Sequence, residues 1–123
     1  MSNTPPISTH PSATTFSDFA LDERILRAIA DAGYSTPTPI QAQAIPVVLS
    51  GQDVMGSAQT GTGKTASFVL PILQKILPLS STSTSPARHP VRALVLCPTR
   101  ELAVQVADNA HTYAKHTDIR TAV

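Results

Sequence analysis

The chain has 123 residues, a net charge of +1 and a single cysteine, and these values already exclude several classes of protein. A chain of this length forms one domain or a piece of one, and its 41% apolar residues can supply a core. Because Cys97 stands alone, an internal disulfide framework and a cysteine-based zinc site are excluded. No apolar run is long enough for a bilayer and the N-terminus does not resemble a secretory signal, so we expect a cytoplasmic protein.

Charge is distributed unevenly along the chain. Residues 1–60 hold two arginines and five acids, a sum of −3, whereas residues 61–123 hold seven Lys/Arg and three acids, a sum of +4. The second half is therefore the expected side for an anionic partner.

The first thirty-odd residues predict a tail followed by a helix. Residues 1–15 are rich in Ser, Thr and Pro, which is typical of a disordered tail. Apolar residues then recur at helical spacing from Leu21 to Ile29. Asp22 fits the N-cap and Gly33 the C′ position, so a helix of about ten residues is expected.

A second helix start follows at Thr38. Thr38 fits the N-cap, Pro39 the N1 position and Gln41 the N3 position of a capping box. Pro46 is expected to interrupt this helix, and the following apolar residues end at Gly51.

Residues Ala58 to Thr65, A-Q-T-G-T-G-K-T, have the composition of a phosphate-binding loop. Glycines allow backbone N–H groups to face an anion, and the helix that begins near Gly63 directs its positive dipole end there. In such a loop Lys64 reaches the β/γ-phosphates and the Thr65 hydroxyl binds Mg²⁺. The strict pattern G-x-x-x-x-G-K-S/T fails at Ala58, and the alternative is a Gly/Thr-rich surface turn.

The elements around this loop predict a parallel α/β sheet. A short strand over residues 53–57 precedes the loop, and a helix kinked at Pro71 follows it to about Leu77. Beyond a low-complexity loop at 80–90, a nearly continuous apolar strand covers 91–97. A helix then begins at Thr99 or Arg100 and carries Leu102, Val106, Ala110 and Tyr113, and a further strand begins at Ile119. This alternation of strands and helices indicates the α/β class.

Two further stretches have the chemistry of binding sites, and each has a structural alternative. Gln41 can pair with N6 and N7 of adenine and Tyr34 can stack on a base, but Gln41 also completes a capping box and Tyr34 also suits a core. Thr99 and Arg100 follow an apolar strand, where a hydroxyl and a guanidinium can contact a phosphodiester backbone. Equally, Thr99 can simply cap the helix and Arg100 can be solvated.

Taken together and in this order, these stretches resemble the DEAD-box family of ATP-dependent RNA helicases. Residues 33–41 resemble the Q motif of that family, with Phe16 as its isolated upstream aromatic. Residues 58–65 resemble motif I, in which the family itself carries alanine at the position of Ala58, and residues 98–103 resemble motif Ia. The resemblance runs from about Phe16 to Val123, and residues 91–105 are most similar to the bacterial RhlE-type branch.

The resemblance implies a RecA-like P-loop NTPase domain that uses ATP and Mg²⁺ and acts on RNA. It implies that Tyr34 and Gln41 hold adenine with Phe16 packed nearby. Phosphates and Mg²⁺ would be held by the end of the loop, namely Thr60, Gly61, Thr62, Gly63, Lys64 and Thr65, with Lys64 and Thr65 as the catalytic pair and Thr65 as the metal ligand. Thr99 and Arg100 would touch the RNA backbone. The resemblance also favours an unbroken helix through Pro71.

ATP hydrolysis also needs an acid that holds Mg²⁺ and positions water. After the loop the acids are Glu101, Asp108 and Asp118, and none ends an apolar strand. The D-E-A-D box, the S-A-T motif and the second RecA-like domain are not in this sequence, so residues 16–123 are expected to be the N-terminal part of a longer helicase. The alternatives are a nucleotide- or RNA-binding module without turnover, and a P-loop GTPase or kinase, although the N-K-x-D guanine signature is absent.

Overall fold

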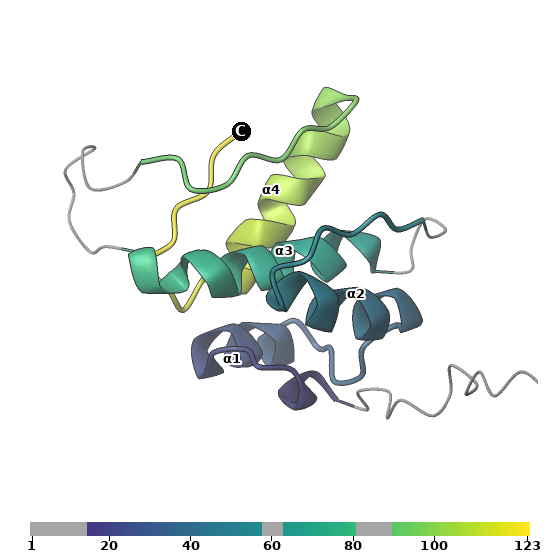
Figure 1. The fold of residues 1–123 in the computed structure, drawn as a ribbon. Coiled ribbons are helices and arrows are strands. Elements are labelled where there is room, and N and C mark those ends of the chain that lie inside the picture. Colours follow the sequence, from purple (N-terminus) through teal and green to yellow (C-terminus); the bar gives the residue numbers. More distant parts are fainter. Residues whose placement is uncertain (1–14, 58–62, 81–89) are drawn as a thin grey trace, which may run out of the picture.

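The computed structural model describes residues 15–57, 63–80 and 90–123, and within these ranges its regular elements are helical. A 3₁₀ turn, η2 (Phe16–Asp18), precedes α1 (Glu23–Asp31) and α2 (Pro39–Leu49). After the phosphate-loop stretch come α3 (Lys64–Ile76), a second 3₁₀ turn, η3 (Leu77–Leu79), and α4 (Arg100–Ala114) (Figure 1). The tail expected at 1–15 and the loop expected at 80–90 lie almost entirely outside the described residues.

Helix α1 forms where the sequence predicts it and for the expected reasons. Asp22 is its N-cap and accepts a hydrogen bond from the backbone N–H of Arg24 at 2.9 Å. At the other end Gly33 adopts φ 88°, and the backbone N–H of Tyr34 donates to the Ile29 carbonyl at 3.2 Å. This is a Schellman motif, which needs a left-handed residue that glycine supplies at little cost.

Helix α2 confirms its predicted start and corrects its predicted end. Thr38 and Gln41 form the capping box, with Pro39 at the first helical position. The expected interruption at Pro46 is wrong, because α2 continues through it to Leu49. Pro46 lies on the exposed side, where its ring meets little packing, and the missing N–H costs one hydrogen bond to the Ala42 carbonyl without ending the helix.

Helix α3 runs through the centre of the molecule. It passes Pro71 without a break, as expected, and ends at Ile76, one residue before the predicted end. Its interior residues are almost fully covered: Leu70 is 0% exposed and Leu73 is 3% exposed. Gln74 also accepts a hydrogen bond from the backbone N–H of Asp22 at 2.5 Å, which joins α3 to the start of α1.

Helix α4 begins at the predicted N-cap, Thr99, whose hydroxyl accepts from the backbone N–H of Leu102 at 3.2 Å. Its inward face carries Val106 and Tyr113, both buried. Its C-terminal end meets α1, where Asp31 pairs with Lys115 at 3.1 Å and with Nε2 of His116 at 2.7 Å.

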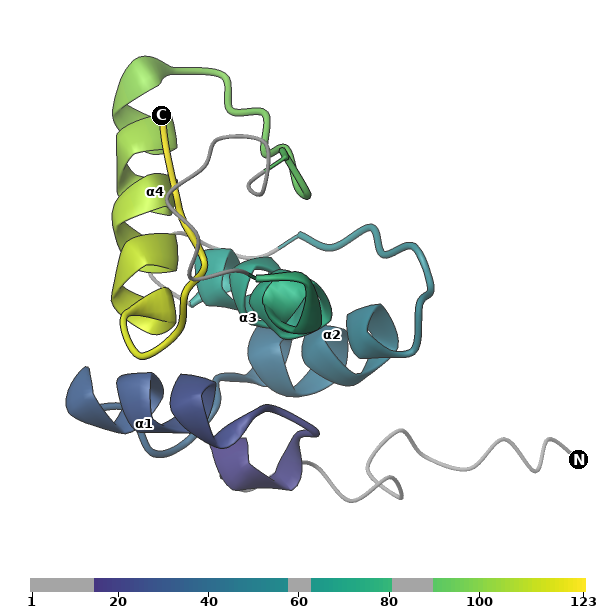
Figure 2. The same cartoon turned by 90° about the vertical axis from the view of Figure 1, so that its left-hand side faces the viewer.

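The helices are arranged around α3. Helices α2 and α3 lie side by side, α1 lies below them, and α4 stands across α3 on the other side (Figures 1 and 2). One continuous core joins all of them, because apolar residues from each helix face inward. Its buried members are Phe16, Phe19, Leu21, Ile25, Ile29, Ile45, Ala66, Val69, Leu70, Leu73, Leu77, Val106, Tyr113 and Ala114.

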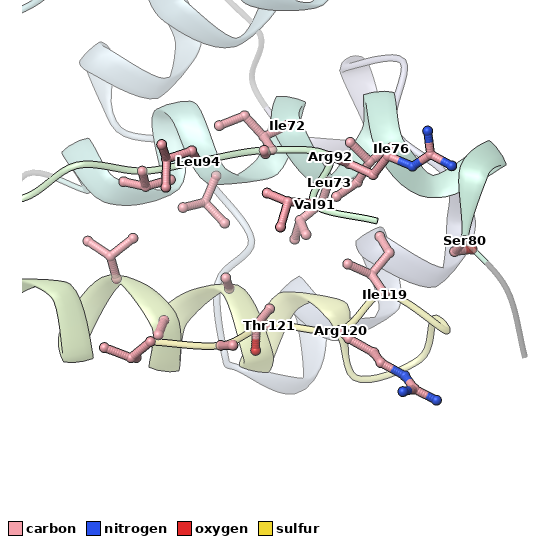
Figure 3. Close-up of a pocket in the computed structure, with 18 of the residues that line it drawn as sticks. Ile72, Leu73, Ile76, Ser80, Val91, Arg92, Leu94, Ile119, Arg120 and Thr121 are labelled. Carbon is pink, nitrogen blue, oxygen red and sulfur yellow. The ribbon is translucent and has the colours of Figure 1, made fainter. Parts of the chain in front are cut away.

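The three predicted strands are not formed among the described residues. Residues 53–57, 91–97 and 119–123 have no ladder pairing there, so the parallel sheet is not observed. Segment 91–97 lies with 119–123 over a cavity of about 610 Å³ between α3 and α4 (Figure 3). The physical reason is that a strand buried on both faces needs partners to fill its hydrogen bonds. Here Val91 and Leu96 are each 84% exposed.

None of the helices that the structure describes combines the length and apolar character that crossing a membrane requires.

Candidate nucleotide-binding site

The start of α3 differs from the starts of the other α-helices in the described ranges. Helices α1, α2 and α4 have side-chain caps from Asp22, Thr38 and Thr99. Helix α3 begins at Gly63, which has no side chain and adopts φ 79°. The first four N–H groups of a helix have no acceptor within the helix. Among the described residues no side chain caps the start of α3, and helix-start amides without such a cap are the arrangement that binds anions.

The charge at this end fits the same purpose. Lys64 is the first residue of α3 and is exposed, and no acid lies in the first turn. A cation at a helix N-terminus opposes the helix dipole, so this position is unfavourable for the helix itself. Thr65 follows it and is half-buried. An ammonium group and a hydroxyl beside helix-start amides can hold phosphate oxygens and a phosphate-bound metal ion.

Gln41 joins the predicted adenine stretch to the start of α3. Its Oε1 accepts a hydrogen bond from the backbone N–H of Thr38 at 2.9 Å, which completes the capping box. Its Nε2 donates to the carbonyl of Gly63 at 3.1 Å. The side chain is buried, at 6% exposure. The structural interpretation of Gln41 as a capping residue is therefore confirmed, and Gln41 also lies beside the predicted phosphate site.

The two predicted aromatics have opposite environments. Tyr34 is 56% exposed, so the alternative that it is a core ring is wrong. Its backbone is held by the Schellman motif of α1, which leaves the ring available at the surface. Phe16 is 6% exposed and packs edge-on against Phe19, with ring centroids 6.0 Å apart. Phe16 is thus part of the hydrophobic core.

The predicted RNA-contacting pair lies at a separate place. Thr99 and Arg100 are exposed at the start of α4, which rises above the layer of α2 and α3 in Figures 1 and 2. Thr99 caps the helix, as its structural alternative proposed. Helix-start amides and an exposed guanidinium still form a surface that an anionic backbone can contact.

Three predicted site residues fall outside the described part of the chain, and no role at the nucleotide site was predicted for Thr38 from the sequence. Thr60, Gly61 and Thr62 lie outside the described residues. Thr38 was predicted only as a cap, yet its Oγ1 would lie 3.2 Å from a Cβ added at Gly63. The Q-motif resemblance was the available signal, because it placed Thr38 beside Gln41. In the part of the chain that is described, no three His, Cys, Asp or Glu residues gather as a metal site.

The 610 Å³ cavity is not this site. It lies between α3 and α4, and most of its lining is aliphatic, as Ile72, Leu73, Ile76, Leu94 and Ile119 illustrate (Figure 3). Such a surface suits packing against protein and not a triphosphate.

Comparison with protein-family models shows to which family this chain belongs. The family model described as DEAD/DEAH box helicase matches residues 38–123. The chain belongs to the DEAD/DEAH box helicase family. The resemblance noted from the sequence is therefore confirmed at the level of the family, whereas its RhlE-type branch stays a prediction.

Individual relatives agree with this assignment. The ATP-dependent RNA helicase SrmB of Escherichia coli is 51% identical over 90% of this chain and 24% of its own length. A DEAD box protein from Methanococcus jannaschii has a solved structure with TM-score 0.70 and 34% identity, covering 86% of this chain and 26% of that one. The RNA helicase Prp28 of Chaetomium thermophilum, bound to ADP, gives TM-score 0.66 and 41% identity over 78% of this chain and 22% of that one.

The two solved structures are DEAD-box proteins with RecA-like domains, so the predicted RecA-like domain type is confirmed. The predicted parallel sheet is not observed among the described residues. The chain spans about a quarter of the length of these relatives.

Proposed function

We propose that the complete protein is an ATP-dependent RNA helicase, in which ATP binding and hydrolysis are coupled to separation or remodelling of RNA duplexes. The observation that carries this proposal is the start of α3. There a glycine cap, an exposed Lys64 and the Gln41 contact occur together in a chain of the DEAD/DEAH box family. SrmB is named an RNA helicase and Prp28 was solved with ADP, which supports an adenine nucleotide and RNA as ligands.

The residues have distinct roles in this proposal. Gly63 and the first-turn amides of α3 bind phosphate oxygens together with Thr60, Gly61 and Thr62 of the loop. Lys64 compensates the β/γ-phosphate charge and Thr65 binds Mg²⁺, which when bound neutralises charge that develops on the phosphates. Gln41 and Tyr34 select adenine, Phe16 supports them from the core, and Thr99 and Arg100 contact the RNA backbone.

Donor and acceptor counting supports the role of Gln41. A glutamine amide has two N–H donors and an oxygen with two lone pairs. Thr38 and Gly63 use one of each. The remaining N–H and lone pair are the combination that N7 and N6 of adenine require.

The finer features of the fold are also part of the proposal. In the complete domain, residues 53–57, 91–97 and 119–123 form parallel strands, and the aliphatic cavity between α3 and α4 is closed by that sheet. The nearly continuous apolar run at 91–97 supports this, because only a strand covered on both faces needs such a composition. A cytoplasmic location accords with the function.

Nucleotide turnover tests the proposal. The complete protein should release phosphate from ATP faster with RNA than without it, and much faster than from GTP. Replacing Gln41 with Ala should weaken ATP binding by about 1–3 kcal/mol, because a buried pair of hydrogen bonds is lost. Equal turnover of ATP and GTP would contradict adenine selection, and binding without turnover would favour the alternative of a nucleotide- or RNA-binding module.

A further inference from the structure

The backbone N–H of Asp22 has its acceptor on a distant helix. Asp22 is the N-cap of α1, and its N–H donates to Oε1 of Gln74 at 2.5 Å across 52 positions of sequence. In a capping box this donor is satisfied locally, by a Glu or Gln at the third helical position. Helix α2 has that arrangement, with Gln41 as the acceptor for the N–H of Thr38. In α1 the third position is Ile25, which has no side-chain oxygen, so Gln74 completes the cap of α1 from another helix.

Apolar packing holds the same two parts of the chain together but does not define their register. Phe16, Phe19 and Leu21 precede Asp22 and are 6%, 6% and 8% exposed, and they share one core with residues of α3. Apolar attraction is non-directional, so it does not by itself select one alignment of the two surfaces. A hydrogen bond requires a defined distance and direction. The partly buried bond to Gln74 therefore selects one position of this segment on α3.

The two partners of this bond belong to different parts of the proposed nucleotide site. The segment capped at Asp22 has Phe16 before α1 and Tyr34 after it, and both are on the proposed adenine side. The helix that provides Gln74 begins at Lys64, on the proposed phosphate side. Helix α1 lies below α3 in Figure 2. The bond thus joins the part of the chain that would read the base to the helix that would hold the phosphates.

We propose that Gln74 is a positioning residue for adenine selection. Its amide fixes the base-reading part of the chain on α3, so that the base and the phosphates of one nucleotide are contacted together. Gln74 lies near the opposite end of α3 from Lys64, so it touches neither ligand and acts through the backbone of Asp22. This inference rests on the proposed function, because it assumes that Phe16 and Tyr34 lie beside the base and that the start of α3 receives the phosphates.

The inference is tested with ligands that separate the base from the phosphates. Calorimetry measures the binding of magnesium ATP, magnesium GTP and magnesium tripolyphosphate to the complete protein and to Gln74→Met. Methionine keeps the side-chain length and the helix propensity but has no strong acceptor. ATP should bind the variant about three- to tenfold more weakly, the range expected for one lost hydrogen bond, and the preference for ATP over GTP should narrow. Tripolyphosphate should bind within about twofold of the wild type, because the start of α3 is unchanged.

Two further variants separate the hydrogen bond from other effects of the substitution. Gln74→Glu keeps an acceptor oxygen at the same side-chain length, and the N-terminus of α1 favours an anion, so ATP affinity should return to within about twofold of the wild type. Lys75→Ala is the matched control, because Lys75 is the next residue of α3 and is exposed, and it should bind all three ligands like the wild type. The ratio of ATP to tripolyphosphate affinity is taken within each preparation, so that a difference in the folded fraction cancels.

Three results would overturn the inference. If Gln74→Met binds ATP and tripolyphosphate with equal losses, or with no loss of either, Gln74 supports the fold alone. If Gln74→Glu binds ATP as weakly as Gln74→Met, the acceptor oxygen is not the group that matters. If the wild type does not prefer ATP to GTP, the proposed function fails before any variant is compared, and the inference fails with it. Should Gln74→Met lose its helical circular dichroism, Gln74→Asn, which keeps the amide but is one methylene too short for the contact, replaces it in every measurement.

Discussion

Lys64 occupies a position that the helix alone would not favour. It is exposed at the first position of α3, where the helix dipole repels a cation. No acid in that turn compensates it. A bound ligand that supplies negative charge at this end of α3 would explain why a cation occupies this unfavourable position.

Lys64→Ala should therefore separate stability from function. We expect the variant to be as stable as the wild type or more stable, by about 0.3–1 kcal/mol, because the unfavourable dipole interaction is removed. Hydrolysis of ATP by the complete protein should fall below detection, since phosphate charge is left uncompensated. Urea denaturation and phosphate release measure the two effects, and an active variant would contradict the assignment of this loop.

For single residues, the sequence predicts local features well, but it does not predict contacts that depend on tertiary packing. The capping box, the glycine ends and the N-caps at Asp22, Thr38 and Thr99 are local features, and all are confirmed because they depend on neighbouring residues. The bond from Gln41 to Gly63 joins residues distant in sequence, and no local pattern predicts it. The environments of Tyr34 and Phe16 likewise depend on tertiary packing, which their spacing does not reveal.

At the scale of elements, proline placement shows where local rules fail. The rules expect a break at Pro46, but α2 continues through it to Leu49 with one hydrogen bond fewer. Helix α3 continues through Pro71, as expected. The predicted strands are not formed for a different reason. Their apolar pattern predicts the burial that a complete sheet would give, but these segments alone do not supply the backbone hydrogen-bond partners that a sheet requires.

Pro46→Ala is expected to stabilise the protein by about 1–2 kcal/mol. The change restores a donor to the Ala42 carbonyl and removes a poor helix former from an exposed position, while greater freedom of the unfolded chain offsets part of the gain. Pro71→Ala is the matched control. Pro71 is among the fully buried side chains, so lost packing should cancel the gain, and thermal melts compare the two. A less stable Pro46→Ala would show that the ring supports α2.

The contact between α1 and α4 should make stability depend on pH in the acid range. Hydrogen bonds from His116 and then Lys115 lower the pKa of Asp31 below its ordinary value of 3.8. A carboxyl whose pKa is lower in the folded state contributes stability above its unfolded pKa and loses it as pH falls through the folded one. We therefore expect part of the stability to disappear below about pH 4.

Asp31→Asn tests this contact. The variant should be slightly less stable at pH 7, and its stability should change less between pH 5 and pH 3 than that of the wild type. Urea denaturation at several pH values measures the difference. The contact is exposed, so the effect should also shrink in high salt, and an unchanged acid dependence in the variant would assign it to other groups.

At the scale of the whole molecule, the exposed apolar residues of segment 91–97 distinguish this chain from the proposed complete domain. Leu96 is 84% exposed and is not among the residues that line the cavity between α3 and α4. Exposed apolar segments with unpaired backbone groups invite association. We expect the isolated 123-residue chain to be weakly folded, to self-associate and not to hydrolyse ATP.

Leu96→Lys should act in opposite directions on the two forms. In the isolated chain it should raise solubility, because it replaces exposed apolar surface with charge. In the complete protein it should cost several kcal/mol, because the proposed sheet buries that position. Val104→Lys, on an exposed position of α4, should be nearly neutral in both. Solubility and urea denaturation measure the effects, and equal effects of Leu96→Lys on both forms would refute the proposed sheet.

Three polar side chains connect the helices of the described ranges: Gln41 joins α2 to α3, Gln74 joins α3 to α1, and Asp31 joins α1 to α4. Gln41 and Gln74 bind backbone groups, so no change of a partner side chain can restore either contact, whereas Asp31 pairs with exposed side chains that can be exchanged. The chain should thus have little freedom to vary at positions 41 and 74 and more at position 31, while exposed neighbours such as Gln43 and Lys75 accept most replacements. A library of variants selected for function should show this contrast among the variants that survive. The connections between the helices would then limit which substitutions the chain can accumulate during evolution.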